Sequence, residues 1–347
     1  MEDLRSRTPL TGLTLPAMTH LLGSRTRAVA ALRWLYASAP SPSSLPRAVP
    51  GVSGKSWAAV AEQCELSRPL VAERAAASDG TVKYGLDFAG ARVETVLIPS
   101  KGRSTVCVSS QAGCSRHCSF CATARLGLTR NLTAAEMVDQ FLVARDDAPD
   151  GSPLKNVVFM GMGEPMDNLD AVLTAVEILT QTPAPQLGLG QVTVSTAGVL
   201  PGMRRFLKEC RANLALSLNA TTDAQREALM PRTAQWPISA LVEALREDAP
   251  RGRRITFIEY VLFAGLNDTD EDAGRLLSLL AGLPVRLNLI PHNPFEGSDL
   301  RPPAPERVRE FQTLVHRGGI RCLLRGPRGQ DINAACGQLT RARKARR

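Results

Sequence analysis

The chain has 347 residues, 44% of them hydrophobic, so it can bury a sizeable core and form a large domain with a smaller one, or two domains. No apolar run approaches the ~20 residues that cross a bilayer, and residues 1–10 lack the apolar stretch of a signal peptide. In a chain without a signal peptide, eight cysteines indicate a reducing, cytoplasmic location. The net charge of +9 favours a polyanion partner, most simply nucleic acid, while 4% aromatic residues argue against a platform that stacks single-stranded bases.

Residues 1–80 are expected to form a small helical module. Apolar residues recur at three- and four-residue steps up to about residue 36, and a segment rich in Pro and Ser follows over 37–54. Residues 55–78 show a helical pattern again. The next stretch, 81–99, alternates polar and apolar residues on both sides of Ala89-Gly90 and predicts a β-hairpin.

From residue 100 onward, strand patterns alternate with helix patterns. Strands are expected at residues 105–110, 157–160, 192–196, 214–219, 255–262, 285–290 and 320–324. Helices are expected near 134–145, 169–180, 202–210, 238–247, 270–281 and 305–317. This alternation predicts an α/β fold with a parallel sheet, open or rolled into a barrel. Ligands of such folds bind beyond the C-terminal ends of the strands.

Three cysteines follow the first of these strands at the spacing C-x3-C-x2-C, namely Cys114, Cys118 and Cys121. Three thiolates so close in sequence can bind one iron–sulfur cluster, and because such clusters normally take four cysteines, one iron would stay open. A zinc site completed by His117, a disulfide framework and chance clustering are the alternatives. His117 adjoins Cys118 and would point away from a shared metal. The spacing resembles that of the radical S-adenosylmethionine (SAM) enzymes, whose open iron chelates the amino and carboxylate groups of SAM.

Small and polar residues end the other predicted strands. In the run Phe-Met-Gly-Met-Gly-Glu-Pro over 159–165, glycines allow close approach of a ligand and Glu164 can accept an ammonium group. Ser195, Ser217 and Asn293 end the third, fourth and sixth strands. Each of these is singly more often a turn residue than a ligand contact. Together, beside a cluster loop, they predict one SAM pocket.

Five motifs occur in order, at 106–114, 161–165, 217–220, 290–294 and 334–338. With them the chain closely resembles the radical SAM methyltransferases that methylate an adenine ring carbon of large-subunit ribosomal RNA. Part of that family also modifies transfer RNA, and related enzymes methylate C8 instead of C2. The resemblance is weaker in the N-terminal module, which is similar to the family's accessory RNA-binding domain in position and in Trp34-Leu35-Tyr36.

The resemblance implies an incomplete (β/α) barrel of the radical SAM type over 100–331, followed by a C-terminal segment over 332–347. The basic run that ends this segment is either an RNA contact or a solvated terminus. The implied cofactors are a [4Fe–4S] cluster and SAM. The implied RNA partner is 23S ribosomal RNA, with C2 of adenine favoured, and for part of the family also transfer RNA. The implied protein partner is an electron donor such as a flavodoxin or ferredoxin. A monomer is expected.

The resemblance also implies a role for each matching residue. The cluster ligands would be Cys114, Cys118 and Cys121. The SAM pocket would be lined by Gly163, Glu164, Ser195, Ser217, Leu218, Asn219 and Asn293. Cys336 would carry the methyl group, Cys107 would be its disulfide partner, and Glu94 would accept a proton. Without the resemblance, these two cysteines are small buried hydrophobic residues and Glu94 is a strand-edge carboxylate.

In the family scheme, one SAM methylates Cys336 and a radical made from a second SAM removes hydrogen from that methyl group. The resulting carbon radical adds to the adenine, and Cys107 releases the product by forming a disulfide. The scheme is needed because the methyl group of SAM and C2 or C8 of adenine are both electrophilic, so polar transfer cannot join them.

Two segments depart from the family pattern, at 232–236 and at 326–330, where a more acidic stretch is common. Both can contact RNA, so the modified nucleotide stays open. Two rival functions also stay open. One is a radical SAM enzyme with another substrate, and the other is a ribosome-associated RNA-binding protein with a structural or redox-sensing cluster. Formation of 5′-deoxyadenosine separates the enzymes from the binding protein.

Overall fold

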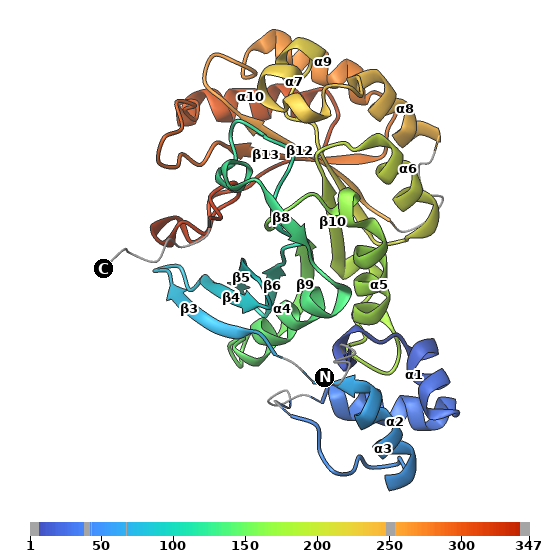
Figure 1. Ribbon diagram of the computed structural model, residues 1–347. Helices are drawn as coiled ribbons and strands as arrows, with labels where there is room; N and C mark the ends of the chain where they lie inside the picture. The colour runs from blue at the N-terminus through green and yellow to red at the C-terminus, as the bar shows by residue number, and fades with distance from the viewer. Residues whose placement is uncertain (1–6, 38–41, 43, 67, 248–253, 341–347) are drawn as a thin grey trace.

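A computed structural model describes residues 7–37, 42, 44–66, 68–247 and 254–340 of the chain (Figure 1). The basic run over 341–347 therefore lies outside the described residues. Within them, no helix is both long enough and apolar enough to cross a membrane.

A ten-stranded sheet forms the centre of the molecule, in the order β14-β13-β12-β11-β10-β9-β6-β5-β4-β3. Its larger part is parallel and contains β6 (Arg103–Cys107), β9 (Leu154–Phe159), β10 (Val192–Thr196), β11 (Asn213–Ser217), β12 (Thr256–Leu262), β13 (Val285–Pro291) and β14 (Cys322–Leu324). These strands agree with the seven that the sequence predicts. Because they are parallel, their C-terminal ends lie along one edge of the sheet.

Helices cover the outer side of this parallel part, as Figure 1 shows. The six predicted helices are confirmed as α4 (Ala134–Asp146), α5 (Leu169–Thr180), α6 (Leu200–Glu209), α8 (Ile238–Glu247), α9 (Asp270–Leu280) and α10 (Pro305–Arg317). A short helix that was not predicted, α7 (Asp223–Leu229), follows β11. In α4 and α9, Thr133 and Thr269 each cap the helix together with an acidic residue three positions later.

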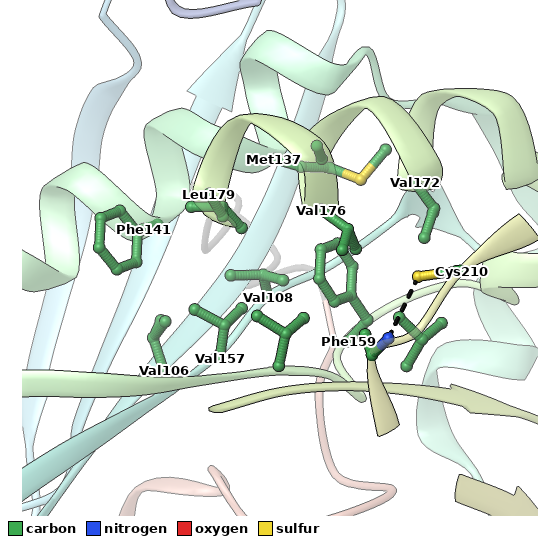
Figure 2. Close-up of a cluster of buried hydrophobic side chains, with 14 of the residues drawn as sticks. Val106, Val108, Met137, Phe141, Val157, Phe159, Val172, Val176, Leu179 and Cys210 are labelled. Atoms are coloured by element: carbon green, nitrogen blue, oxygen red, sulfur yellow. Dashed lines mark hydrogen bonds between the residues drawn. The ribbon is translucent and has the colours of Figure 1, made fainter. Parts of the chain in front are cut away.

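The core lies between the sheet and these helices, and Figure 2 shows one part of it. Val106, Val157 and Phe159 rise from β6 and β9, and all three are fully buried. Val172 and Val176 face them from α5, where a spacing of four residues puts both on one side of the helix. Strands covered by helices in this way are almost continuously apolar, which made them predictable from the sequence.

An antiparallel extension continues the sheet beyond β6, through β5 (Ala91–Ser100), β4 (Val82–Phe88) and β3 (Leu70–Ala76). The hairpin predicted over 81–99 is confirmed as β4 and β5. The prediction of helix up to residue 78 is wrong, because the structure has β3 there. The backbone groups of β4 would remain unpaired at an open edge without β3. Pairing with them outweighs the helical propensity of residues 70–76.

The N-terminal module contains α1 (Leu15–Leu22), α2 (Arg25–Leu35) and α3 (Gly54–Gln63), and a short parallel pair of β1 (Thr8–Pro9) and β2 (Cys64–Glu65). The module is thus largely but not wholly helical. Gly23, with φ of 61°, ends α1 and separates it from α2. Trp34 and Trp57 meet edge to face at 5.5 Å between ring centroids, so both are structural.

The two outer strands of the sheet, β14 and β3, are its ends, so the barrel does not close. The fold is therefore the incomplete (β/α) barrel that the sequence analysis expected. Its open edge and the C-terminal strand ends are the places where a ligand site can form.

Candidate active site

The loop with the three cysteines is held by a small hairpin. Strand β7 (Gln111–Gly113) runs directly into Cys114 and pairs with β8 (Leu128–Asn131). Gly113 has φ of +84°, and a Cβ atom there would lie 1.9 Å from the carbonyl oxygen of Gly127. Only glycine permits this close approach. The hairpin therefore fixes the two ends of the cysteine loop relative to each other.

Cys114, Cys118 and Cys121 line one cavity at the C-terminal ends of the strands. Burial raises the pKa of the Cys114 thiol to about 12, and it raises the pKa of Cys118 and Cys121 as well. For Cys118, the nearby charges of the other two thiolates add to the effect of burial. Bound iron supplies the positive charge that three buried thiolates need, so this donor set fits a metal cluster.

The geometry disfavours a zinc ion held by the same cysteines and His117. No group of three His, Cys, Asp or Glu side chains in the described part of the chain is placed to hold one metal ion. His117 has φ of 54° and lines an adjoining cavity, apart from Cys114 and Cys121. His117 is therefore not placed as a fourth ligand beside Cys114 and Cys121, and three cysteine ligands that line one cavity fit an iron–sulfur cluster with one open iron.

The loop after β9 forms another wall of the cavity. Gly163 has φ of +102°, and a Cβ atom there would lie 2.5 Å from the Cβ of Gln111, so glycine lets this loop pack on β7. Glu164 is buried, and its carboxylate accepts hydrogen bonds from the N–H groups of Ala197 (2.7 Å) and Met166 (3.0 Å). Burial nevertheless raises its pKa to about 7. A buried carboxylate of this kind is suited to a cationic ligand group.

Four of the other predicted SAM residues line the same cavity: Ser195, Ser217, Asn219 and Asn293. Asn219 adopts a left-handed conformation, with φ of 55°, and its Oδ1 accepts a hydrogen bond from Val261 N–H at 2.9 Å. Leu218 differs from them, because its side chain is fully buried in the core and is not part of the cavity lining.

Cys336 also lines this cavity, although it is far from the cluster loop in sequence. Burial raises the pKa of Cys107 to about 12, and the negative charge of a nearby Cys336 thiolate is the second cause of this shift. The same charge contributes to the raised pKa of Cys121. Cys336 is therefore close to both the disulfide partner and the cluster loop that the resemblance implies. Both Cys107 and Cys336 are free thiols in the structure, so their disulfide stays a prediction.

Glu94 does not line the cavity. It is buried on β5, where Oε1 lies 3.2 Å from the Nζ of Lys83 and Oε2 accepts a hydrogen bond from the N–H of Thr340 at 2.6 Å. Burial raises its pKa, and the Lys83 ammonium opposes that shift. Its carboxylate therefore faces a lysine and the C-terminal segment.

Sequence reasoning missed three charged residues at the site. Glu259 on β12 and Arg325 after β14 line the cavity and form an ion pair at 3.3 Å. Arg226 on α7 is fully buried and donates hydrogen bonds to the carbonyl oxygens of Ala197 and Leu218, which holds the ends of β10 and β11 together. A signal for Glu259 existed, since it is a carboxylate in an otherwise apolar strand.

Comparison with known proteins fits this geometry. Residues 108–277 match the model of the Radical SAM superfamily. Over 306 residues, the chain is 47% identical to the Probable RNA methyltransferase sce1580 of Sorangium cellulosum, covering 87% of this chain and 77% of that protein. The chain belongs to the radical SAM RNA methyltransferase family.

Further relatives agree with this assignment. The Dual-specificity RNA methyltransferase RlmN of Cereibacter sphaeroides is 44% identical over 307 residues, which cover 83% of this chain and 78% of that protein. A crystal structure of a radical SAM methyltransferase from Sphaerobacter thermophilus superposes with a TM-score of 0.86 at 38% identity, covering 96% of this chain and 99% of that one.

Family membership confirms several predictions from the sequence. This radical SAM methyltransferase is an enzyme, and its cofactors are a [4Fe–4S] cluster and SAM. The residues that would hold the cluster are Cys114, Cys118 and Cys121, whose shared cavity fits it. The family also weighs against the rival function of an RNA-binding protein with a merely structural cluster.

Proposed function

We propose that this enzyme methylates a ring carbon of adenine in 23S ribosomal RNA and in transfer RNA, with C2 favoured over C8. One observation carries the proposal: Cys336 lines the same cavity as the three cluster cysteines, with Cys107 close to it. A basic chain with a net charge of +9 suits an RNA substrate. The relative named as a dual-specificity RNA methyltransferase supports two classes of RNA. We further infer a cytoplasmic monomer that receives electrons from a flavodoxin or ferredoxin.

The residues of the strand ends would bind and orient SAM. The Glu164 carboxylate would accept the ammonium group, because it is buried beside the cluster loop and accepts hydrogen bonds from the neutral N–H groups of Ala197 and Met166. Ser195, Ser217, Asn219 and Asn293 offer hydroxyl and amide groups in the same cavity for the ribose, carboxylate and adenine. Leu218 would act only by shaping the wall behind them.

The cluster, when bound, supplies the electron that cleaves SAM reductively and so provides the radical chemistry that an electrophilic adenine carbon requires. The protein's part begins with Cys336, whose thiolate attacks the methyl group of SAM. A carbon–sulfur bond forms, and S-adenosylhomocysteine leaves with the electrons of the broken bond. Cys336 then holds this methyl group at the cavity wall, in reach of the site where SAM is cleaved.

Release of the product falls to the second cysteine. After the methyl carbon has joined the adenine, the Cys107 thiolate attacks the sulfur of Cys336. The disulfide forms, and the electrons of the broken carbon–sulfur bond go to the product carbon, which takes up a proton. The unpaired electron that radical addition leaves on the ring would pass to a one-electron acceptor, for which the proposed electron carrier is the candidate. A reductant must then restore both thiols before the next turnover. The resemblance assigns removal of the ring proton to Glu94, which would have to leave its ion pair with Lys83 to reach the base.

The target adenine must leave its stack to reach Cys336, so an unpaired or flipped base is the expected substrate. The N-terminal module, residues 1–80, would contact the surrounding RNA. The two segments that depart from the family pattern, 232–236 and 326–330, are candidates for the choice of nucleotide.

The test uses enzyme with a reconstituted cluster, SAM labelled in its methyl group, and ribosomal or transfer RNA. Wild-type protein should give labelled RNA and 5′-deoxyadenosine, whereas Cys336→Ala should give no labelled RNA. Cys107→Ala should accumulate RNA that is covalently bound to the protein. Cys322→Ala, which alters a buried thiol outside the cavity, is the matched control and should resemble wild type. Label in RNA made by Cys336→Ala would contradict the proposal.

Mass-spectrometric mapping of RNA from a deletion strain identifies the nucleotide. Loss of 2-methyladenosine from both ribosomal and transfer RNA is the expected result. Loss of 8-methyladenosine instead would assign the enzyme to the C8-methylating relatives. Production of 5′-deoxyadenosine without any loss of RNA methylation would indicate the rival radical SAM enzyme with another substrate.

A further inference from the structure

One ion pair contacts the segment that carries Cys336 on both sides of this cysteine. We call residues 329–340 the Cys336 loop. Lys83 Nζ donates a hydrogen bond to the carbonyl oxygen of Asn333 at 3.3 Å, on one side of Cys336. Glu94 Oε2 accepts a hydrogen bond from the N–H of Thr340 at 2.6 Å, on the other side. Lys83 and Glu94 themselves pair at 3.2 Å. The backbone before and after Cys336 is thus joined through two side chains of the sheet, while Asp79 accepts a hydrogen bond from the N–H of Gly329 at the start of the loop.

The sheet register places this ion pair beside Cys107. Val96 of β5 lies opposite Lys83 on one side and opposite Cys107 on the other. Glu94 is two residues from Val96, so its side chain points to the same face of the sheet. Lys83, Glu94 and Cys107 therefore share the inner face. Strand β6 thus presents the proposed disulfide partner beside the anchors of the Cys336 loop, which lie on the antiparallel extension.

Burial makes these contacts costly to leave unmade. Lys83 is 8% exposed and Glu94 is 2% exposed. A buried charge pair is retained at little or no loss only when further hydrogen bonds satisfy its remaining donors and acceptors. Here those further bonds go to the backbone of the Cys336 loop. If the loop leaves, both charges lose partners, and the pair therefore favours the docked loop.

The middle of the loop contacts the short turn that follows Cys121 instead. Gly337 accepts a hydrogen bond from Ala122 N–H at 2.7 Å, and Leu339 accepts one from the Thr123 hydroxyl, also at 2.7 Å. The carbonyl oxygen of Cys336 accepts a hydrogen bond from the Asn293 amide at 3.2 Å. These bonds hold the backbone, while the Cys336 residue as a whole is exposed. The thiol can therefore turn without undocking the loop.

We propose that Lys83 and Glu94 form a clamp that holds the Cys336 loop against the sheet and positions Cys336 between Cys107 and the cluster cysteines. Glu94 is then a positioning residue through its contact with Thr340, whether or not it also accepts a proton. Cys336 must meet SAM, then the RNA base, then Cys107, and a loop anchored at both ends keeps one thiol within reach of all three. The chemical purpose of the clamp rests on the proposed function, but the clamp itself does not.

The decisive variant exchanges the two charges, Lys83→Glu with Glu94→Lys. The exchanged pair can still form across the hairpin, but a lysine cannot accept from Thr340 N–H and a glutamate cannot donate to Asn333. Amide hydrogen exchange of the full-length protein, without RNA, measures the docking of residues 329–340. We expect exchange there to rise about tenfold or more, because each lost bond joins a charged group to the backbone. Peptides from β9 to β11 should be unchanged.

A second variant tests the clamp from the other side and avoids any risk to the hairpin. Thr340→Pro removes the N–H that Glu94 accepts and leaves the ion pair intact. It should also raise exchange over 329–340. Arg92→Met is the matched control, since it removes an ion pair with Asp87 on the same two strands near their turn. It should leave exchange in the loop at the wild-type value.

Unchanged exchange over 329–340 in the charge-exchanged protein or in Thr340→Pro would overturn the clamp. The outcome is separate from that of the proposed function. A loop that loosens as expected, in a protein whose wild type methylates no RNA, would support the clamp and refute the RNA substrate. If the wild-type protein methylates RNA but the variants leave amide exchange over 329–340 unchanged, the RNA substrate would be supported and the clamp refuted.

Discussion

The parallel part of the sheet and its antiparallel extension build different halves of the same site. In the parallel part, from β6 to β14, function lies at the strand ends, where Glu164 and Asn219 stand in loops beside the cluster cysteines. In the extension, from β3 to β5, the strand ends contribute nothing to the cavity lining, and the inner face of the strands supports the Cys336 loop.

This difference follows from how the strands are connected. Parallel strands need crossovers, which bring every second loop to the same edge and gather many short loops around one ligand. Antiparallel strands return by tight turns, as at Ala89-Gly90, so their loops are too short to reach inward. Their flat inner face is instead a surface on which another segment can dock. The proposed cofactor half is therefore built from loops, and the proposed methyl-carrier half from one face of the sheet.

The largest effect should come from removing a cluster ligand in the cofactor half. Cys118→Ala leaves two of the three proposed cluster ligands, too few to hold the cluster, so iron content and brown colour should fall to background after anaerobic reconstitution. Both 5′-deoxyadenosine and methylated RNA should be lost. Cys64→Ala, at a buried thiol of the N-terminal module, should retain all three. Full iron in Cys118→Ala would refute the assignment of this ligand.

Alanine substitution of glycine should lower the unfolding free energy more in the cofactor half than in the antiparallel extension. Gly163→Ala in the cofactor half meets the Cβ of Gln111 at 2.5 Å and also strains a positive φ. It should cost roughly 2–3 kcal/mol of unfolding free energy and weaken SAM binding. Gly90→Ala in the hairpin turn has the same sign of φ but meets nothing within 4 Å, so it should cost about 1 kcal/mol or less. Thermal unfolding measures both, and equal losses would contradict the reading of Gly163.

The third largest effect should be a pH dependence of stability and of SAM binding, caused by Glu164 in the cofactor half. Glu164 has its pKa raised from 4.5 to about 7 by burial. Since the folded state prefers the protonated form, ionisation of Glu164 lowers the stability of the free protein as pH rises from about 4.5 to about 7. SAM binding should show the opposite trend. It needs the carboxylate, so affinity should fall by up to about tenfold per pH unit below 7.

Titration calorimetry of the reconstituted enzyme between pH 5.5 and about 8 can follow this binding. Glu164→Gln should bind SAM more weakly at every pH and lose the pH dependence. A wild-type affinity that stays constant across this range would show that Glu164 does not receive the ammonium group.

The smallest effect should come from the outer side of the extension. Arg74 on β3 pairs with Asp147 at 2.9 Å, with side chains that are 48% and 36% exposed. Exposed ion pairs contribute about 0–1 kcal/mol. Arg74→Ala should therefore change the unfolding free energy by less than 1 kcal/mol and leave loop exchange and RNA methylation unaltered. A large loss of methylation would mean that the outer face also takes part in function.

The sequence predicted the cofactor half better than the methyl-carrier half. Runs such as the one over 192–196 identify buried parallel strands, and the cysteine spacing identifies the cluster loop, because each pattern is local. Strand β3 was missed because only its partner β4 makes it a strand. The Lys83–Glu94 pair, Arg226 and the Glu259–Arg325 pair were missed for the same reason, since each joins residues that are distant in the chain. Leu218 matched its motif, but its side chain packs in the core.

The unclosed sheet has a consequence for the size of the substrate. A sealed cylinder admits only what can pass through its mouth, and a folded polynucleotide cannot. Because β3 and β14 do not pair, a loop connection rather than a strand pairing closes this side, where the Cys336 loop meets the extension. A long polymer could lie along this side, with one nucleotide inside and its neighbours still in water. A site that takes one nucleotide at a time would then suffice for the large RNA substrate proposed above.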